Sequence, residues 1–125
     1  MLRSMFRLKL LVAAAALLAS NATFADNESG LAAIYNYRLH GHKTACGEVY
    51  NKNALTTAHQ TLPCGSKVKI TNQKNHKSVV LRVTDRGPTQ AGRIVDVSTR
   101  AAKALGMHRV DLTPVELKVI KKGKP

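Results

Sequence analysis

Beyond position 30 the apolar residues of this chain come in short runs, and the clearest runs alternate with polar residues. In residues 67–71, Val68 and Ile70 alternate with lysines, and a second β-branched run covers 78–84 after a polar turn. A period of two is typical of a half-buried strand, so the two runs predict a β-hairpin. Strands this short and this closely spaced usually close into a small barrel or sandwich, which makes the predicted class mainly β.

The remaining runs add further strands and one helix. More strands are expected at 31–37, 93–97, 109–112 and 115–120. Pro114 is expected to separate the last two, and residues 53–59 fit either a short helix or a short strand. Ser98 is a good N-cap for a short helix that Gly106 ends. About six strands and one helix, without a repeat or a linker, predict a single domain in this 125-residue chain.

The first 25 residues have the layout of a secretory signal peptide. Three basic residues precede the apolar run 10–18, and small residues lead to an expected cut before Asp26. The run is too short to span a bilayer stably, and a buried N-terminal helix is the alternative. No cysteine precedes Cys46. We therefore expect residues 26–125 to be an exported, soluble domain that is not a lipoprotein and has no stable membrane anchor.

The charge of the chain is strongly basic. It has 20 Lys and Arg against seven Asp and Glu; three of the basic residues and none of the acids lie before position 26, which leaves 17 − 7 = +10. Such a charge favours polyanions. Nucleic acid is not expected, because the part after residue 25 has no Phe or Trp for base stacking. Anionic wall polymers and stem-peptide carboxylates fit the charge, and a merely solvated basic surface is the other interpretation.

Cys46 and Cys64 are the only cysteines. An even number of cysteines in a small exported domain predicts a disulfide, worth about 3 kcal/mol for a loop of this length. A zinc site with His40, His42 or His59 is the alternative, but the spacing matches no common zinc pattern. We therefore expect no metal and no other cofactor.

Few acids are available for catalysis. Asp26 and Glu28 fall in a polar start, 26–30, that is expected to be flexible, and two more acids lie near the final strands. The remaining acids are Glu48, Asp85 and Asp96.

Asp85 is the most informative of these acids. Period-two counting places it on the same strand face as Val79, Leu81 and Val83, so a carboxylate ends an apolar stripe. Partial burial would raise its pKa, as a general acid requires, whereas Arg86 would lower it. Capping of the following turn is an equally open role. Asp96 is better explained by ordering of the helix start, and Glu48 and His59 are candidates only.

Several stretches match one known pattern in order and spacing. They are 41–48 (GHKTACGE), 55–59 (LTTAH), 62–65 (LPCG), 83–88 (VTDRGP), 92–98 (GRIVDVS), 101–102 (AA) and 104–107 (ALGM). Together they resemble the double-psi β-barrel of the rare lipoprotein A family, over about residues 31–120. The resemblance implies a six-stranded barrel, a periplasmic location and peptidoglycan glycan strands as the partner; we expect a monomer.

The resemblance also implies an activity. Active members are similar to lytic transglycosylases, which cut the β-1,4 bond between N-acetylmuramic acid and N-acetylglucosamine, preferring strands without stem peptides. The muramic C6 hydroxyl attacks C1 and leaves a 1,6-anhydro end. One group must protonate the leaving oxygen and deprotonate that hydroxyl, and no second, water-activating carboxylate is needed.

Site residues carry over from the family position by position. Asp85 takes the acid/base role, with His59 expected to hold or tune its carboxylate. Glu48 is expected to orient a partner or to stabilise positive charge on the sugar. Expected substrate-binding or supporting residues are Tyr35, Arg86 and Asp96.

The sequence departs from the family pattern in its aromatic residues and cysteines. The usual Ala-Ser-Trp-Tyr-Gly is here 32–36 (AAIYN), so only Tyr35 remains, and Thr89 replaces an aromatic residue. Fewer aromatic faces mean weaker sugar stacking. The cysteine pair is similar to that of expansin and barwin barrels. Alternatives are therefore a non-catalytic wall-loosening module, in which the aspartate matching Asp96 matters, and an inhibitor or effector scaffold.

Overall fold

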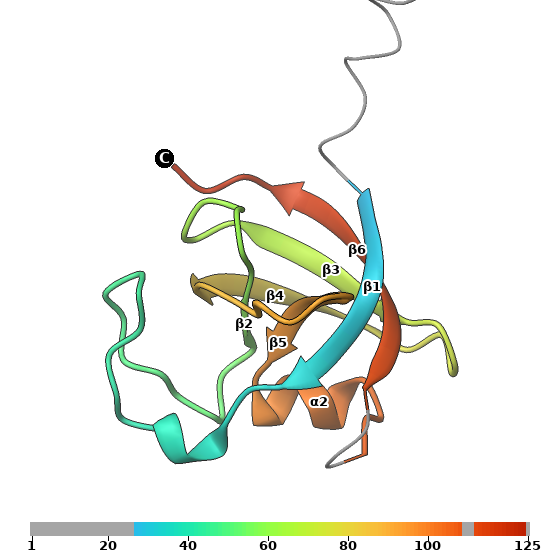
Figure 1. Cartoon of the computed structure of the whole chain (residues 1–125), viewed down its shortest axis with the longest axis horizontal. Coiled ribbons are helices and arrows are strands. Elements are labelled where there is room, and N and C mark those ends of the chain that lie inside the picture. The colour runs from blue at the N-terminus through green and yellow to red at the C-terminus, as the bar shows by residue number, and fades with distance from the viewer. Residues whose placement is uncertain (1–26, 109–111, 125) are drawn as a thin grey trace, which may run out of the picture.

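A closed barrel of six strands forms the part of the chain that the computed structural model describes, residues 27–108 and 112–124 (Figure 1). The strands are β1 (Asn27–Ile34), β2 (Thr56–Ala58), β3 (Lys67–Asn72), β4 (Ser78–Asp85), β5 (Arg93–Val97) and β6 (Thr113–Lys121). A short 3-10 helix, η1 (Tyr37–Leu39), follows β1, and helix α2 (Thr99–Ala104) follows β5. The predicted mainly β barrel is confirmed. The expected signal peptide lies outside the described residues.

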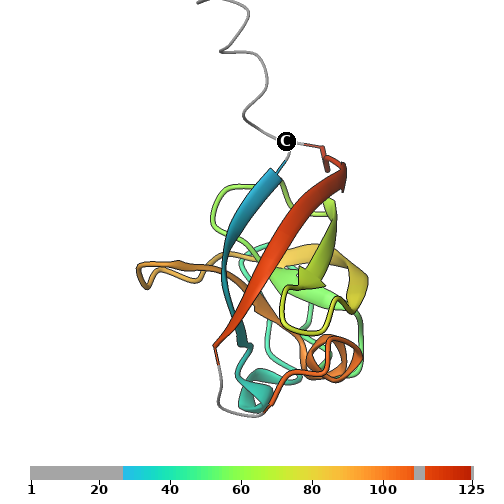
Figure 2. The same ribbon diagram turned by 90° about the vertical axis from the view of Figure 1, so that its right-hand side faces the viewer.

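The strand order around the barrel is β1-β5-β2-β4-β3-β6. The pairs β1–β5 and β2–β4 are parallel, and the other neighbours are antiparallel, including the β3–β4 hairpin that the sequence predicts. Figure 2 shows β1 and β6 running side by side, which closes the sheet. This mixed six-stranded barrel is the double-psi fold expected from the resemblance.

Alternating side chains of the strands fill the barrel. On β3, Val68 and Ile70 are buried while the lysines beside them are exposed, as a period of two requires. Buried valines and leucines of the other strands and of the α2 end complete the core; they include Leu81, Val83, Val95, Val97, Leu105, Val115 and Leu117. Burial of this apolar surface is the main stabilising contribution to the fold.

One segment differs from the prediction at the start of the described chain. β1 begins at Asn27 rather than at residue 31, so the expected flexible start is wrong. Gly30 lies within this strand, and a Cβ there would be 2.6 Å from Cγ2 of Ile94 on β5. A glycine therefore permits the close approach of β1 and β5 at this point. The ambiguous segment 53–59 contains the short strand β2.

Pro114 does not separate two strands, as the sequence suggested, but lies inside β6. The carbonyl oxygen of Pro114 accepts a hydrogen bond from the main-chain N–H of Gln73 at 2.9 Å. The N and C=O of a strand residue face the same neighbour, and here β3 has already ended at Asn72. The missing N–H of Pro114 therefore removes no ladder bond. Of the strand predicted at 109–112, only Leu112 is described.

Within the described residues, no helix is both long enough and apolar enough to cross a bilayer.

Ser98 joins the barrel to helix α2. Its Oγ donates to the Ala54 carbonyl oxygen at 2.6 Å and accepts from the Ala101 N–H at 3.2 Å, which confirms the predicted N-cap. The side chain is fully buried. We therefore expect Ser98→Ala to lower the free energy of unfolding by about 1–3 kcal/mol in urea titrations. The control Ser78→Ala, at the exposed start of β4, should change it far less; equal losses would contradict this role for Ser98.

Candidate functional site

Asp85 ends β4 beside the short strand β2. The β2–β4 register runs from Thr57 opposite Val83 to Ala58 opposite Asp85, so Thr84 is skipped by a bulge. Both Val83 and Thr84 are buried as a result. Strict period-two counting therefore fails at this point, although it did place Asp85 at the end of the apolar stripe. The bulge re-aims the last side chain of β4.

Two segments distant in sequence from Asp85, together with the main chain of the next residue, converge on its carboxylate. Its Oδ1 accepts from the main-chain N–H groups of Ala45, at 2.9 Å, and Arg86, at 2.8 Å. Its Oδ2 is hydrogen-bonded to the hydroxyl of Tyr35, which follows β1. The carboxylate is partly buried, so these bonds fix its orientation at the edge of the barrel. The turn-capping bond from Arg86 and the bonds expected of a functional carboxylate are both present.

Tyr35 is held as a hydrogen-bond donor. Its ring packs against that of Tyr50, with 4.3 Å between the ring centroids. Burial raises the pKa of the Tyr35 hydroxyl, and the hydrogen bond to Asp85 and the negative charge of that residue raise it further. The phenol therefore stays protonated at neutral pH and keeps donating toward Asp85.

Asp96 lies close to the same carboxylate. Ala58 of β2 is opposite Asp85 on β4 and opposite Asp96 on β5, so the two acids flank one small residue. Burial raises the pKa of Asp96; the nearby Arg93 lowers it, and the charge of Asp85 raises it. The structure thus brings together Tyr35, Asp85 and Asp96 from the predicted site.

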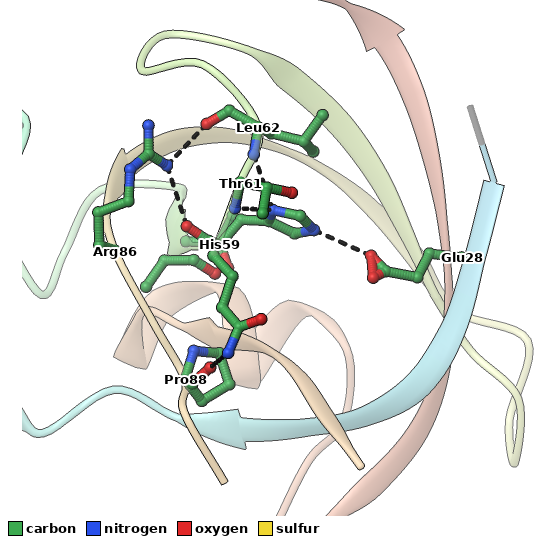
Figure 3. Close-up of polar contacts among 9 residues, drawn as sticks. Glu28, His59, Thr61, Leu62, Arg86 and Pro88 are labelled. Carbon is green, nitrogen blue, oxygen red and sulfur yellow. Dashed lines mark hydrogen bonds and ion pairs between the residues drawn. The ribbon is translucent and has the colours of Figure 1, made fainter. Parts of the chain in front are cut away.

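The His59 ring points elsewhere (Figure 3). Its Nδ1 accepts from the N–H groups of Thr61 and Leu62, both at 3.1 Å, which leaves the hydrogen on Nε2 for Glu28 Oε1 at 2.9 Å. The ring is buried, and the link between His59 and Asp85 is a main-chain bond, from His59 N–H to the Asp85 carbonyl at 3.1 Å. The resemblance suggested that His59 holds or tunes the Asp85 carboxylate. The ring itself does not hold that carboxylate.

Glu48 forms an ion pair with Arg82 of β4 rather than a bond to Asp85. Both side chains are about two-fifths exposed, so the pair itself contributes little free energy. The carbonyl oxygen of Glu48 accepts from the Thr44 N–H at 2.7 Å, in the tight loop that carries Ala45. Glu48 thus fixes to β4 the loop that supplies one N–H group to Asp85.

Arg86 organises the segment that follows β2. Its guanidinium donates to the carbonyl oxygens of His59, at 3.0 Å, and Leu62, at 2.6 Å (Figure 3). The disulfide joins Cys46 to Cys64, with 5.8 Å between their Cα atoms, and so ties this segment to the loop that carries Ala45. The predicted disulfide is confirmed, and the alternative of a zinc site that uses these cysteines is wrong.

Asp85 lines neither of two hollows on the described surface. One, of about 430 Å³, is lined by residues that include Glu28, His59 and Lys122. The other, of about 520 Å³, lies beside α2 and is lined by residues that include Tyr37 and Met107. A much smaller recess is lined by Tyr35, which binds the Asp85 carboxylate, and by Ala58 and Asp96.

Two contributors to the site region were missed by the sequence analysis. Glu28 was assigned to a flexible start, but it lies on β1 and binds His59 across 31 positions of sequence. Ala45 contributes through its main-chain N–H, for which a side-chain pattern gives no signal. Glu28 would have been found only if the first strand had been predicted to begin at Asn27.

The raised pKa of Asp96 makes its charge unfavourable to folding. A carboxyl whose pKa is higher in the folded state destabilises the fold above that pKa, and the penalty disappears below the unfolded value of 3.8. We expect Asp96→Asn to raise the free energy of unfolding near pH 7, with the gain shrinking toward pH 3. Denaturant titrations at both pH values measure this change. Glu116→Gln, at an exposed acid of β6, should show no such gain; a loss of stability for Asp96→Asn at pH 7 would contradict the assignment.

Known proteins match this chain over the residues that form the barrel. The family described as lytic transglycolase matches residues 27–117. The chain is 46% identical over 99 residues to the probable endolytic peptidoglycan transglycosylase RlpA of Synechocystis, covering 79% of this chain and 31% of that protein. It is 47% identical over 98 residues to the endolytic peptidoglycan transglycosylase RlpA of Vibrio cholerae, covering 78% and 37%. The chain thus spans about a third of the length of these relatives.

Solved structures share the fold at low identity. The expansin of Clavibacter michiganensis has a TM-score of 0.61 at 19% identity, covering 79% of this chain and 52% of that one. A Streptomyces papain inhibitor has a TM-score of 0.59 at 18% identity, covering 79% and 98%. These likenesses support the barrel alone. The family match and the sequence identities show that the chain belongs to the rare lipoprotein A (RlpA) family.

Proposed function

We propose that this protein is an endolytic peptidoglycan lytic transglycosylase. Its substrate would be the β-1,4 bond between N-acetylmuramic acid and N-acetylglucosamine, cut with formation of a 1,6-anhydro end. The names of its relatives support this activity. The observation that carries the proposal is the partly buried Asp85 carboxyl, fixed by Tyr35, Ala45 and Arg86.

The hydrogen bonds of Asp85 indicate which oxygen exchanges the proton. Two N–H groups occupy both lone pairs of Oδ1, whereas Oδ2 shares one bond with Tyr35. The proton of the acid form is therefore placed on Oδ2. Donation to the glycosidic oxygen breaks the C1–O bond, and the C6 hydroxyl oxygen then attacks C1. The same Oδ2 takes the hydroxyl proton, which restores the acid without water.

The other family residues act in this proposal as positioning residues. Glu48, through Arg82, holds the loop that supplies the Ala45 N–H. His59 anchors the segment after β2 and supplies its main-chain N–H to the Asp85 carbonyl. We assign to Tyr35 the orientation of Oδ2, and to the charge of Asp96 the stabilisation of positive charge that develops at C1.

The proposed substrate preference rests on the aromatic residues near Asp85. Tyr35 is the aromatic residue kept from the usual opening, and few aromatic faces are available for sugar stacking. Binding would then depend on a glycan backbone that lies flat against the barrel edge, which stem peptides would hinder. A preference for strands without stem peptides is therefore proposed.

Export is part of the same proposal. Residues 1–25 would be a signal peptide that delivers domain 26–125 to the periplasm without a lipid anchor. A peptidoglycan-cleaving enzyme must act outside the cytoplasm, and the disulfide between Cys46 and Cys64 is stable in an oxidising compartment. We propose that the protein acts as a monomer.

Digestion of purified peptidoglycan tests the activity. With intact sacculi and with strands freed of stem peptides, we expect anhydro-muramic ends by mass spectrometry, formed faster from the freed strands. Asp85→Asn should remove at least about 99% of this product, because an amide cannot act as the general acid that the carboxyl supplies. Glu116→Gln, at an exposed acid of β6, makes the same change of charge and should retain the activity.

Other products would contradict the mechanism. Reducing ends formed with water would indicate a hydrolase and give Asp96 the role of a second carboxylate. Binding without soluble products from either substrate would favour an expansin-like wall-binding module.

Removal of the Tyr35 hydroxyl tests the orientation of Oδ2. A hydrogen bond to a charged group is worth about 1.5–3 kcal/mol, so Tyr35→Phe should lower kcat by about ten- to a hundredfold with little change in KM. Initial rates on freed strands measure this effect. Tyr37→Phe, at a side chain that is 59% exposed, is the matched control. Equal rates for Tyr35→Phe and the unmodified protein would show that the hydroxyl is dispensable.

A further inference from the structure

The outer face of β3 and β6 carries a cluster of four lysines. Lys67 and Lys69 on β3 lie opposite Lys121 and Lys118 on β6 in the antiparallel register (Figure 1 shows the two strands side by side). All four side chains are exposed, while Val68 and Leu117 beside them are buried. We call these four residues, Lys67, Lys69, Lys118 and Lys121, the lysine face.

The register makes the lysine face unfavourable for the isolated fold. Directly opposite side chains on antiparallel strands have Cβ atoms about 5 Å apart, and like charges there are destabilising. Among residues 27–108 and 112–124, the ion pairs join Arg82 to Glu48 and His59 to Glu28, and neither includes these lysines. The exposed acid of β6, Glu116, lies opposite Thr71 rather than opposite a lysine. The directly opposite partners on this face are therefore lysines, and Glu116 lies two positions from Lys118 on β6.

The lysine face adjoins the end of the barrel that carries the site. Lys67 lies opposite Arg82 of β4, three positions before Asp85. Arg82 in turn binds Glu48, whose loop supplies the Ala45 N–H to Asp85. A polymer that contacts the lysine face would therefore pass close to the proposed catalytic carboxyl.

The chemistry of the face favours carboxylates on a peptide-bearing polymer. Lysines act as separate point charges, and strand side chains two positions apart are about 6.8 Å apart, so the face offers a grid of single cations. The large apolar side chains exposed next to it are Val80 and Ile120. Membrane-surface binding typically adds Trp, Phe or Leu side chains that enter the bilayer, and on these two strands the described residues include none that are exposed.

We propose that the lysine face binds the stem-peptide carboxylates of the peptidoglycan layer. This inference rests on the proposed function for its polymer. Strands that still carry stem peptides would occupy the lysine face, while a neighbouring strand without peptides reaches Asp85. The protein would in this way bind intact wall and cut its bare segments.

Charge reversal on the face tests the proposal. In the Asp85→Asn background, Lys69→Glu with Lys118→Glu should weaken binding to intact sacculi at low salt by about tenfold or more. Lys74→Glu with Lys77→Glu, at exposed positions of the β3–β4 turn, changes the net charge equally and should have little effect. Neutral replacement, Lys69→Gln with Lys118→Gln, provides a second variant if the reversed pair folds poorly.

A single change separates binding from stability. Lys69→Glu turns a like-charge cross-strand pair into an opposite-charge pair, so it should raise Tm at low salt while it weakens sacculus binding. Lysine-face variants with Asp85 intact should cleave soluble glycan strands without stem peptides at the unmodified rate.

Three outcomes would overturn the proposal. They are unchanged sacculus binding, an equal loss for both charge-reversed pairs, and a loss confined to vesicles of anionic phospholipid, which would assign the face to a membrane. The proposed activity would be contradicted on its own if the unmodified protein formed no anhydro ends. Binding to sacculi would in that case still be lost in the lysine-face variants alone.

Discussion

The pairing of β2 with both β4 and β5 is the contact on which the barrel and its site depend. β2 has three residues, all buried, and it joins the β3–β4 hairpin to the β1–β5 pair. Ala58, its last residue, lies between Asp85 and Asp96 on the two neighbouring strands. A small side chain at this position lets the two carboxyl groups approach each other.

The loops around this strand are tied down by contacts of different kinds. The disulfide joins the loop carrying Ala45 to the segment after β2, and Arg86 holds the carbonyl oxygens of that segment. Glu28 reaches the buried ring of His59 from β1. These contacts tie the loop carrying Ala45 and the segment after β2 to the barrel. Rigid placement of Tyr35 and two N–H groups around one carboxyl is the kind of preorganisation that proton transfer requires.

Local patterns predicted the parts of the fold whose burial depends on nearest neighbours in sequence. The β3–β4 hairpin, β5 and the Ser98 cap were all visible because alternation and capping are local properties. Pro114 misled the prediction, since whether a strand tolerates proline depends on where its neighbour ends. The early start of β1 was also missed, because Asn27 to Gly30 are held by long-range pairing with β6 rather than by an apolar pattern.

The site was predictable in its residues more than in its connections. The resemblance gave Asp85, His59 and Glu48 as the catalytic residues, with Tyr35, Arg86 and Asp96 as supporting residues. In the structure Tyr35 and the Arg86 main chain bind the Asp85 carboxylate, and Asp96 lies nearby. The His59 ring, expected to hold or tune that carboxylate, binds Glu28, which is 31 positions away and carried no motif. Main-chain donors such as the Ala45 N–H leave no trace in residue identity. Such contacts follow from the closed barrel and not from spacing along the chain.

In the proposed mechanism, Asp85 takes the proton of the muramic C6 hydroxyl and not that of a water molecule. Cleavage of stem-peptide-free glycan strands in water enriched with heavy oxygen tests this claim most directly, with mass spectrometry of the products. The account predicts anhydro-muramic ends that contain no heavy oxygen, formed by the unmodified protein and lost with Asp85→Asn. Muramic ends carrying one heavy oxygen atom would show that water attacks C1, and would contradict it.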